Sequence, residues 1–324
     1  MPKIELHHHL EGAAPPAFVR DMARVKGLDV SGIFGANGAY QYRDFLHFLE
    51  VYEKATQPFQ SPDDYALLTA IVLGEAASAG VVYLESFLSP DFCGGRDIGA
   101  WREYLHAMWE AALSAEELGI TMRGIVTAIR HFGPDAAREV AACAQDTAGD
   151  FVVGFGIGGD ENAGNLADFS YAFDMAREAG LRLTAHAGEW GGPQSVREAL
   201  EHLKVERIGH GVRAIEDPAL VVELAARGTV LEVCPGSNVS LGLYPSYGDH
   251  PIAQLRDAGV LVTVSTDDPP FFHTDMTREY EELGQAFGWD AAVFAELNRV
   301  ALEAAFCDDD TRARIAQKLE ASDA

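Results

Sequence analysis

Short apolar runs alternate with amphipathic stretches along the whole chain. Phe45, Phe48 and Tyr52 fall on one face of a helix expected over 44–56, and the segment 217–227 shows the same period. Runs with β-type composition lie between such helical stretches, which is the pattern of β–α units. Strands are predicted at Lys3–His7, Val81–Ser86, Thr121–Thr127, Phe151–Ile157, Arg182–His186, Arg207–Gly209, Thr229–Cys234 and Val260–Ser265.

Eight strand–helix units in 324 residues predict an α/β fold, the (β/α)8 TIM barrel. The interval between the first two strands is about twice as long as the others, so residues 13–80 are expected to carry extra helices as a cap over the barrel mouth. No linker or repeat interrupts residues 1–324, which predicts one domain. A doubly wound open sheet is the alternative, but it needs a glycine-rich phosphate turn after the first strand, and only Glu11-Gly12 follows there.

The amino-acid composition limits the classes of binding partner that the chain can have. Asp and Glu number 50 against 24 Lys and Arg, and a formal charge of −26 repels phosphate backbones and anionic lipid. No nucleic-acid or membrane partner is therefore expected, and no apolar run reaches the length of about 18 residues that a transmembrane helix needs. The start of the chain lacks signal-peptide features, and its four cysteines form no CxxC pair, which predicts a cytoplasmic protein. The oligomeric state stays open, a homo-oligomer included.

Imidazoles and carboxylates end several of the predicted strands. Active sites of such barrels collect at the C-terminal ends of the strands, where the loops surround the mouth. The side chains in this position are His7 and His9 on the first strand, His186 on the fifth, His210 on the sixth, and Asp267 with Asp268 on the eighth. This arrangement predicts a metal ion bound at the mouth.

The run His7-His8-His9 supplies the first candidate ligands. Side chains alternate along an extended segment, so His7 and His9 point to one side and His8 to the other. Because the run lies inside a strand pattern, it does not resemble a fragment of an expression tag. His186 adds a third nitrogen, and Glu189 follows it on a glycine-containing turn. Burial there would suit Glu189 to general acid–base work; the alternative is that it caps the following helix.

The remaining candidates lie at two other strand ends. His210 is flanked by glycines, which let the backbone approach a ligand, although a structural histidine is the alternative. Asp267 and Asp268 face different ways, so one can bind metal while the other meets substrate. A binuclear site often uses a bridging lysine on the fourth strand, and residues 151–159 contain none. One Zn²⁺ per chain is therefore predicted, with an open position for water. Its predicted ligands are His7, His9, His186 and Asp267.

Several motifs together resemble the adenosine and adenine deaminases of the amidohydrolase superfamily. They are ELHHHLEG at 5–12, HAGE at 186–189, GHG at 209–211 and TDDP at 266–269. The segments GGDE at 158–161 and CPGSN at 234–238 resemble two further family segments, and all of them follow the family order.

The resemblance implies a zinc enzyme that replaces the 6-amino group of a purine with oxygen and releases ammonia. In that scheme Asp267 and His210 act with zinc to activate water, and Glu189 gives a proton to purine N1. The resemblance further implies that Asp268 meets N7 and that the backbone N–H of Gly159 meets N3. The expected partner is thus a small purine nucleoside or base.

The choice of purine depends on two segments. Many nucleoside-specific members have Asp, associated with the ribose, where this chain has Glu11, and Glu there also resembles adenine-specific members. The segment PPFFHT at 269–274 resembles bacterial members that act on adenosine. Adenosine or 2′-deoxyadenosine is the predicted substrate, adenine is the alternative, and a modified adenosine such as aminodeoxyfutalosine is a further one.

Two remote alternatives concern the class of protein. A different metal hydrolase on the same barrel, such as a lactonase or amidase, is disfavoured by the missing bridging lysine. A non-catalytic barrel would be expected to have lost Glu189 or a zinc ligand, and all of them are present.

Overall fold

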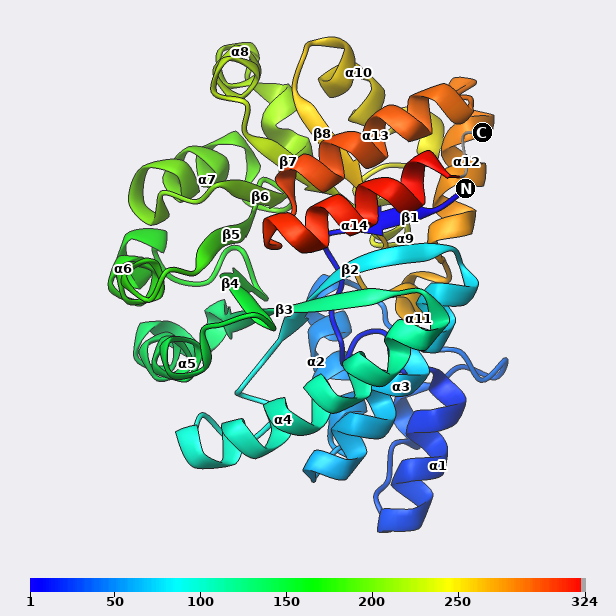
Figure 1. The fold of residues 1–324 in the computed structure, drawn as a ribbon, viewed down its shortest axis with the longest axis vertical. Helices are drawn as coiled ribbons and strands as arrows, with labels where there is room; N and C mark the ends of the chain where they lie inside the picture. The colour runs from blue at the N-terminus through cyan, green and yellow to red at the C-terminus, as the bar shows by residue number, and fades with distance from the viewer. Residues whose placement is uncertain (322–324) are drawn as a thin grey trace.

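The eight predicted strands form one parallel sheet whose spatial order follows the sequence (Figure 1). The structure is a computed structural model that describes residues 1–321. Its strands confirm all eight predictions, with ends shifted by one or two residues. They are β1 (Lys3–Glu5), β2 (Val81–Leu88), β3 (Thr121–Ile129), β4 (Val152–Gly158), β5 (Arg182–Ala187), β6 (Arg207–His210), β7 (Val230–Val233) and β8 (Leu261–Val264).

The sheet closes on itself where the last strand meets the first. The backbone N–H of His9 donates to the carbonyl oxygen of Asp267 at 3.0 Å, and the N–H of Asp267 donates to the carbonyl oxygen of His7 at 3.1 Å. These bonds lie just beyond β1 and β8, so closure of the ring also brings two groups of predicted metal ligands side by side. The predicted (β/α)8 barrel is confirmed.

Helices surround the sheet, and Figure 1 shows α5 to α8 in sequence around one side of it. Proline and glycine mark several ends as the sequence suggests: Pro218 follows the N-cap Asp217 of α8, and Gly228 ends that helix in a left-handed conformation. The longer helices after β2 are α4 (Ile98–Ala115), α5 (Gly133–Thr147), α6 (Ser170–Glu178), α7 (Gly192–Glu198), α8 (Pro218–Arg227), α12 (Met276–Phe287), α13 (Ala291–Ala304) and α14 (Asp309–Glu320). The short ones are α9 (Pro235–Ser240), α10 (Ile252–Asp257) and α11 (Pro269–Phe272).

The interval between β1 and β2 contains α1 (Pro16–Lys26), α2 (Phe45–Thr56) and α3 (Pro62–Ser78). Because α3 contacts β2 and α4, it takes the place of a barrel helix, and α1 and α2 are additional. Extra helices are therefore present where residues 13–80 predict them, and the treatment of this segment as a cap within one domain stays a proposal. None of the helices within residues 1–321 is both long and apolar enough to cross a bilayer.

A buried ion-pair cluster joins strands β2, β6 and β7. Arg207 on β6 lies between Glu85 on β2 and Glu232 on β7, and it pairs with each at 2.6 Å. The Arg207 guanidinium also lies 3.5 Å from the centre of the Phe306 ring. Buried charges are tolerated only when they are paired in this way. The cluster holds Glu232 in a fixed position, from which its carboxylate contacts the ring of His7.

Candidate active site

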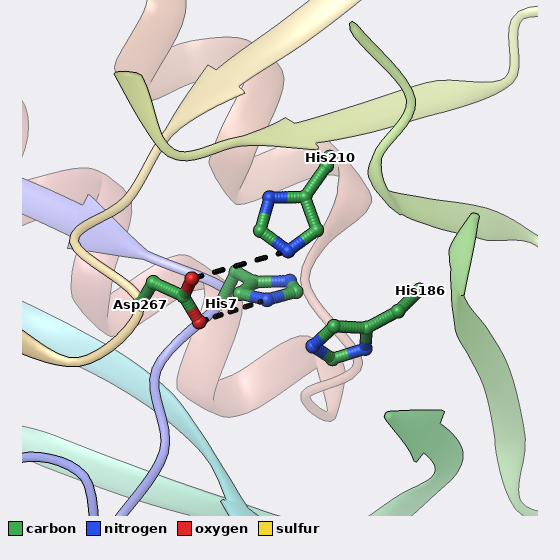
Figure 2. A group of neighbouring side chains, drawn as sticks. All are labelled: His7, His186, His210 and Asp267. Carbon is green, nitrogen blue, oxygen red and sulfur yellow. Dashed lines mark ion pairs between the residues drawn. The ribbon is translucent and has the colours of Figure 1, made fainter. Parts of the chain in front are cut away.

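Four polar side chains from different strand ends turn toward a common point (Figure 2). His7 follows β1, His186 lies on β5, His210 ends β6 and Asp267 follows β8. One nitrogen or oxygen atom from each of the four lies within 4.8 Å of the corresponding atoms of the others. His210 and Asp267 both adopt positive φ, 60° and 67°, so the chain bends sharply as it leaves these two strands.

His9 joins the same cluster. Its Nε2 lies 3.1 Å from Nε2 of His186 and 3.2 Å from Oδ1 of Asp267, while Nε2 of His7 lies 3.5 Å from that oxygen. The structure therefore brings the four predicted ligands together. It also places Nε2 of His210 within 4.0 Å of Oδ2 of Asp267, which puts a fourth imidazole within reach of the same point.

His8 turns away from the cluster, as the alternation of side chains predicts. Its Nδ1 lies 3.0 Å from the hydroxyl oxygen of Ser86 on β2. Burial lowers the pKa of His8 to about 3, so its ring is neutral at ordinary pH. His8 is thus a buried structural side chain beside the cluster.

The cluster has the chemistry of a zinc site. Nε2 of His7 and Nδ1 of His186 are buried and have no hydrogen-bond partner within residues 1–321. Buried polar atoms normally have hydrogen-bond partners, so unpaired nitrogen atoms in a cluster that contains a carboxylate are suited to bind a cation. Imidazole nitrogen and carboxylate oxygen are the ligands that zinc takes in catalytic sites. The donor set fits one zinc ion, and the identity of the metal stays a proposal.

Glu232 on β7 holds the ring of His7 and was not identified from the sequence. Its Oε2 lies 2.9 Å from Nδ1 of His7, and its Oε1 accepts from Nε of Arg207 at 2.6 Å and from the hydroxyl of Thr184 at 2.9 Å. Burial opposes ionisation, but the charge of Arg207 and the bond from His7 hold the pKa of Glu232 below its ordinary value. An ionised Glu232 accepts a hydrogen bond from the Nδ1–H of His7, which leaves the unprotonated Nε2 to face the cluster.

We expect Glu232→Gln to weaken zinc binding by about 10- to 100-fold, because a carboxylate that orients a ligand histidine contributes that much to affinity. Zinc affinity is measured by competition with a chelator, and circular dichroism reports the fold. Thr184→Val is the matched control, since it removes another contact to Glu232 but leaves His7 bonded. Equal affinity in both variants and the parent would show that the orientation of His7 does not depend on Glu232.

The Glu189 carboxyl lies beside the cluster, where the sequence predicts a proton donor. Its Oε1 accepts from the side-chain N–H of Asn238 at 2.9 Å and lies 3.8 Å from Nδ1 of His210. Burial, followed by the negative charges of Asp267 and Glu161, holds the pKa of Glu189 well above its ordinary value. These surroundings favour the protonated carboxyl, which is the form that can give a proton to a ligand.

The turn that carries Glu189 is fixed by Glu161, which follows β4. The Glu161 carboxylate accepts hydrogen bonds from the backbone N–H groups of residues 188–191. Gly188 has a φ of 74°, and a Cβ there would lie 2.4 Å from a methyl group of Val196. The turn therefore requires both a glycine and an acceptor from the end of the neighbouring strand, β4. The sequence indicates the segment 158–161 only by resemblance, and the role of Glu161 becomes visible in the structure.

Asp268 and Gly159 lie at the cavity, and Asp268 has an unused acceptor. Its Oδ1 is buried without a hydrogen-bond partner within the described chain, and a Cβ on Gly12 would lie 1.5 Å from that oxygen. Only glycine at position 12 leaves room for the Asp268 side chain. Burial, followed by the charges of Asp267 and Glu189, raises the pKa of Asp268 well above its ordinary value. Their predicted contacts with purine nitrogens stay proposals.

Glu11 lies behind the cavity wall. Its side chain is buried, and its Oε1 accepts from the hydroxyl of Tyr65 at 3.1 Å. Burial raises the pKa of Glu11 to about 7, and hydrogen bonds from Tyr65 and Tyr52 oppose the shift. Because Tyr52 lines the cavity and Glu11 does not, the predicted influence of Glu11 on the substrate would have to pass through Tyr52.

The cavity lies between the strand ends and α2. Its apolar side comes from α2, which explains the amphipathic pattern of 44–56, and the Phe45 ring stacks on Trp190 at 4.9 Å between ring centres. An apolar wall with a few polar groups suits a flat heteroaromatic ligand. The residues that line it are His9, Phe45, Phe48, Leu49, Tyr52, Glu53, Phe92, Ile129, His131, Gly159, His186, Glu189, His210, Leu241, Asp267 and Asp268.

Comparison with known proteins agrees with this site. The family model described as "Adenosine deaminase" matches residues 2–322. The chain belongs to the adenosine deaminase family. The resemblance predicted from the motifs is therefore confirmed, and the chain is a hydrolytic deaminase of this family.

Relatives within the family carry a narrower name. The chain is 48% identical to an adenine deaminase of Rhizobium johnstonii over 312 residues, which cover 96% of each chain. It is 48% identical to an adenine deaminase of Agrobacterium fabrum over 318 residues, which cover 98% of this chain and 97% of that one. These names support deamination of an aminopurine. They favour adenine, the alternative substrate, over adenosine, the predicted one.

Solved structures give the same fold. The crystal structure of an adenine deaminase from Arthrobacter aurescens matches with a TM-score of 0.91 and 29% identity, covering 100% of this chain and 99% of that one. A zinc-bound amidohydrolase from Burkholderia ambifaria matches with a TM-score of 0.88 and 27% identity, covering 99% of this chain and 90% of that one.

Proposed function

We propose that the chain deaminates adenine to hypoxanthine and ammonia with one zinc ion, in the cytoplasm. The observation that carries the chemistry is the buried Glu189 carboxyl, which lies 3.8 Å from His210 at the edge of the histidine–aspartate cluster. The preference for adenine rests on the names of the relatives described above. Four free, buried cysteines suit a reducing compartment. Adenosine is the second candidate, supported by the segment 269–274.

In this proposal His7, His9, His186 and Asp267 hold the metal. Zinc supplies Lewis-acid chemistry that lets water ionise near neutral pH. The protein contributes the geometry, because three strand ends fix the ligands and Glu232 orients one of them. Trp190 and Phe45 stack beside the cavity and limit the access of bulk water to the reacting centre.

The side chains around C6 of the purine donate and accept the protons that the reaction moves. Glu189 gives its proton to N1, which draws electrons away from C6 and makes that carbon electrophilic. Asp267 and His210, whose Oδ2 and Nε2 lie 4.0 Å apart, act together to take one proton from the attacking water. The amino group then accepts the proton that was taken from water, the C6–N bond breaks and ammonia leaves. The new C6 hydroxyl returns its proton to Glu189 as the C6 carbonyl forms. The backbone N–H of Gly159 and the Asp268 carboxyl orient the ring at N3 and N7.

The experiment that tests this proposal is ammonia release by protein of known zinc content. Adenine, adenosine and 2′-deoxyadenosine are offered side by side. Turnover of adenine with little turnover of the nucleosides would support the proposal. Turnover of the nucleosides in preference to adenine would overturn it in favour of the second candidate. If zinc-replete protein released no ammonia from any of the three, the substrate would have to be sought among larger aminopurines, including a modified adenosine.

Glu11→Asp should shift the preference toward nucleosides. The shorter side chain would no longer reach the hydroxyls of Tyr65 and Tyr52, so Tyr52 in the cavity wall would lose its hydrogen bond to Glu11 and the wall could move to admit a larger ligand. We expect the ratio of kcat/KM for adenosine to that for adenine to rise by about 10-fold, the size of a modest change in pocket contacts. Tyr65→Phe removes the same hydrogen bond and should shift the ratio in the same direction. An unchanged ratio in both variants would disconnect Glu11 from substrate choice.

A further inference from the structure

One carboxylate in the cavity wall has no part in the chemistry proposed above. Three of the four acidic side chains that line the cavity, those of Glu189, Asp267 and Asp268, belong to or adjoin the metal cluster. The fourth, Glu53, comes from α2, and 45% of its side-chain surface is exposed. It is bonded to His131, which follows β3, and so lies on a different side of the cavity from the cluster's ligands.

His131 gives Glu53 a defined orientation. Nδ1 of His131 accepts a hydrogen bond from the backbone N–H of Asp160 at 3.2 Å, so the ring proton of the neutral imidazole lies on Nε2. Nε2 then donates to Oε1 of Glu53 at 3.3 Å. A Cβ on Gly159 would lie 2.8 Å from Nδ1 of His131, which shows that the His131 ring packs directly against Gly159. The Glu53–His131 pair is therefore the neighbour of the Gly159 backbone.

The free base and the nucleoside differ in one donor. Adenine carries a proton on N9, whereas in adenosine N9 carries the ribose and has no hydrogen. Ring atoms N3 and N9 are both bonded to C4, so they face the same edge of the purine. Under the proposed function, on which this step rests, the Gly159 N–H meets N3. The side chains next to Gly159 then face N9.

We propose that Glu53, held in place by His131, accepts the N9–H of a free purine base and so selects bases over nucleosides. The bond to His131 uses Oε1, and Oε2 is the acceptor assigned to the ligand. A 9-substituted purine offers no proton there and leaves a partly desolvated carboxylate without a partner. Because Glu53 is half exposed, solvent reduces this penalty, and an effect of about 10- to 100-fold is expected rather than the larger values of closed sites.

The test compares adenine with 9-methyladenine, which keeps the ring but lacks the N9 proton. In Glu53→Ala, kcat/KM for adenine should fall by about 10- to 100-fold, the range of a hydrogen bond to a charged group. The value for 9-methyladenine should change by less than about 3-fold, and the difference between the two substrates removes steric effects of the methyl group. Glu53→Gln, which keeps an oxygen acceptor, should fall between the parent and Glu53→Ala. Glu50→Gln, an exposed position on the same helix, is the matched control and should behave as the parent.

Three results separate this proposal from the proposed function. If the parent and the control prefer adenine and only Glu53→Ala loses this preference, the result supports both the role of Glu53 and the proposed function. A parent enzyme that prefers adenine, together with a Glu53→Ala variant that keeps this preference or loses both substrates equally, would overturn the role of Glu53 and leave the proposed function intact. A parent enzyme that prefers 9-substituted purines would overturn both.

Discussion

Glu189→Gln is expected to retain zinc and the fold while turnover falls by about 10²- to 10⁴-fold, the contribution of a well-placed general acid–base group. Glutamine can accept the hydrogen bond from Asn238 that Glu189 accepts, so the turn held by Glu161 should persist. It has no carboxyl proton to give to purine N1. The surroundings that raise the pKa of Glu189 therefore contribute to catalysis only when the side chain is a carboxyl, which can give up a proton and take it back.

The measurements are steady-state kcat and KM with adenine, zinc content per chain and the thermal midpoint. Glu201→Gln makes the same chemical change at an exposed position after α7 and should leave all three unchanged. A Glu189→Gln variant with full zinc and near-parental kcat would remove Glu189 from the proton transfer. A fall in kcat together with loss of zinc would indicate a structural role instead.

The barrel could be predicted from the sequence because each of its units carries a strong local signal. Apolar runs of strand length, N-caps such as Asp217 and glycines such as Gly228 mark successive elements, and eight such units have one common architecture. The histidines were located by the same reasoning, since strand ends of a barrel meet at one mouth. His8 shows that the alternation of side chains holds through this run, because its ring turns away from the cluster, as predicted, and contacts Ser86.

What the sequence could not show depends on contacts between distant elements. Glu232 is one acidic residue in an apolar strand, and nothing in its sequence neighbours indicates that it contacts His7, which is 225 residues away in the chain. Glu53 and His131 are far apart in the chain and have no motif in common. The direction of Glu11 could not be predicted either, because regular alternation stops where the chain turns after His9.

These unpredicted contacts form a second layer around the predicted site. Glu232 orients His7, Glu161 holds the turn of Glu189, and His131 orients Glu53. The groups proposed to bind metal and move protons follow from residue type and strand position. Their supporting partners follow from which strand ends and loops the closed barrel brings into contact.

His186→Ala should lose tightly bound zinc and, with it, detectable deamination. Nε2 of His186 lies 3.1 Å from Nε2 of His9, and His186 belongs to the same group of possible ligands as Asp267. Its removal leaves at most three of the proposed ligands. Loss of the outer partner Glu232 is expected to cost about 10- to 100-fold in affinity, and loss of a direct ligand should cost more than about 100-fold. The expected result is therefore less than one-tenth of a zinc ion per chain after dialysis against a weak chelator, where about one is expected in the parent.

The matched control for this variant is His8→Ala. Both changes remove a buried imidazole close to the cluster, but only His186 is proposed to bind metal, so His8→Ala should keep one zinc ion even if its stability falls.

His210→Ala tests a different point. The position of His210, 4.0 Å from Asp267, would let it act as a ligand in place of His9. Retention of zinc in His210→Ala with loss of zinc in His9→Ala would support the proposed ligand set. The reverse result would make His210 a ligand in place of His9. Full zinc in His186→Ala would remove His186 from the set, because a ligand cannot be lost without a change in affinity.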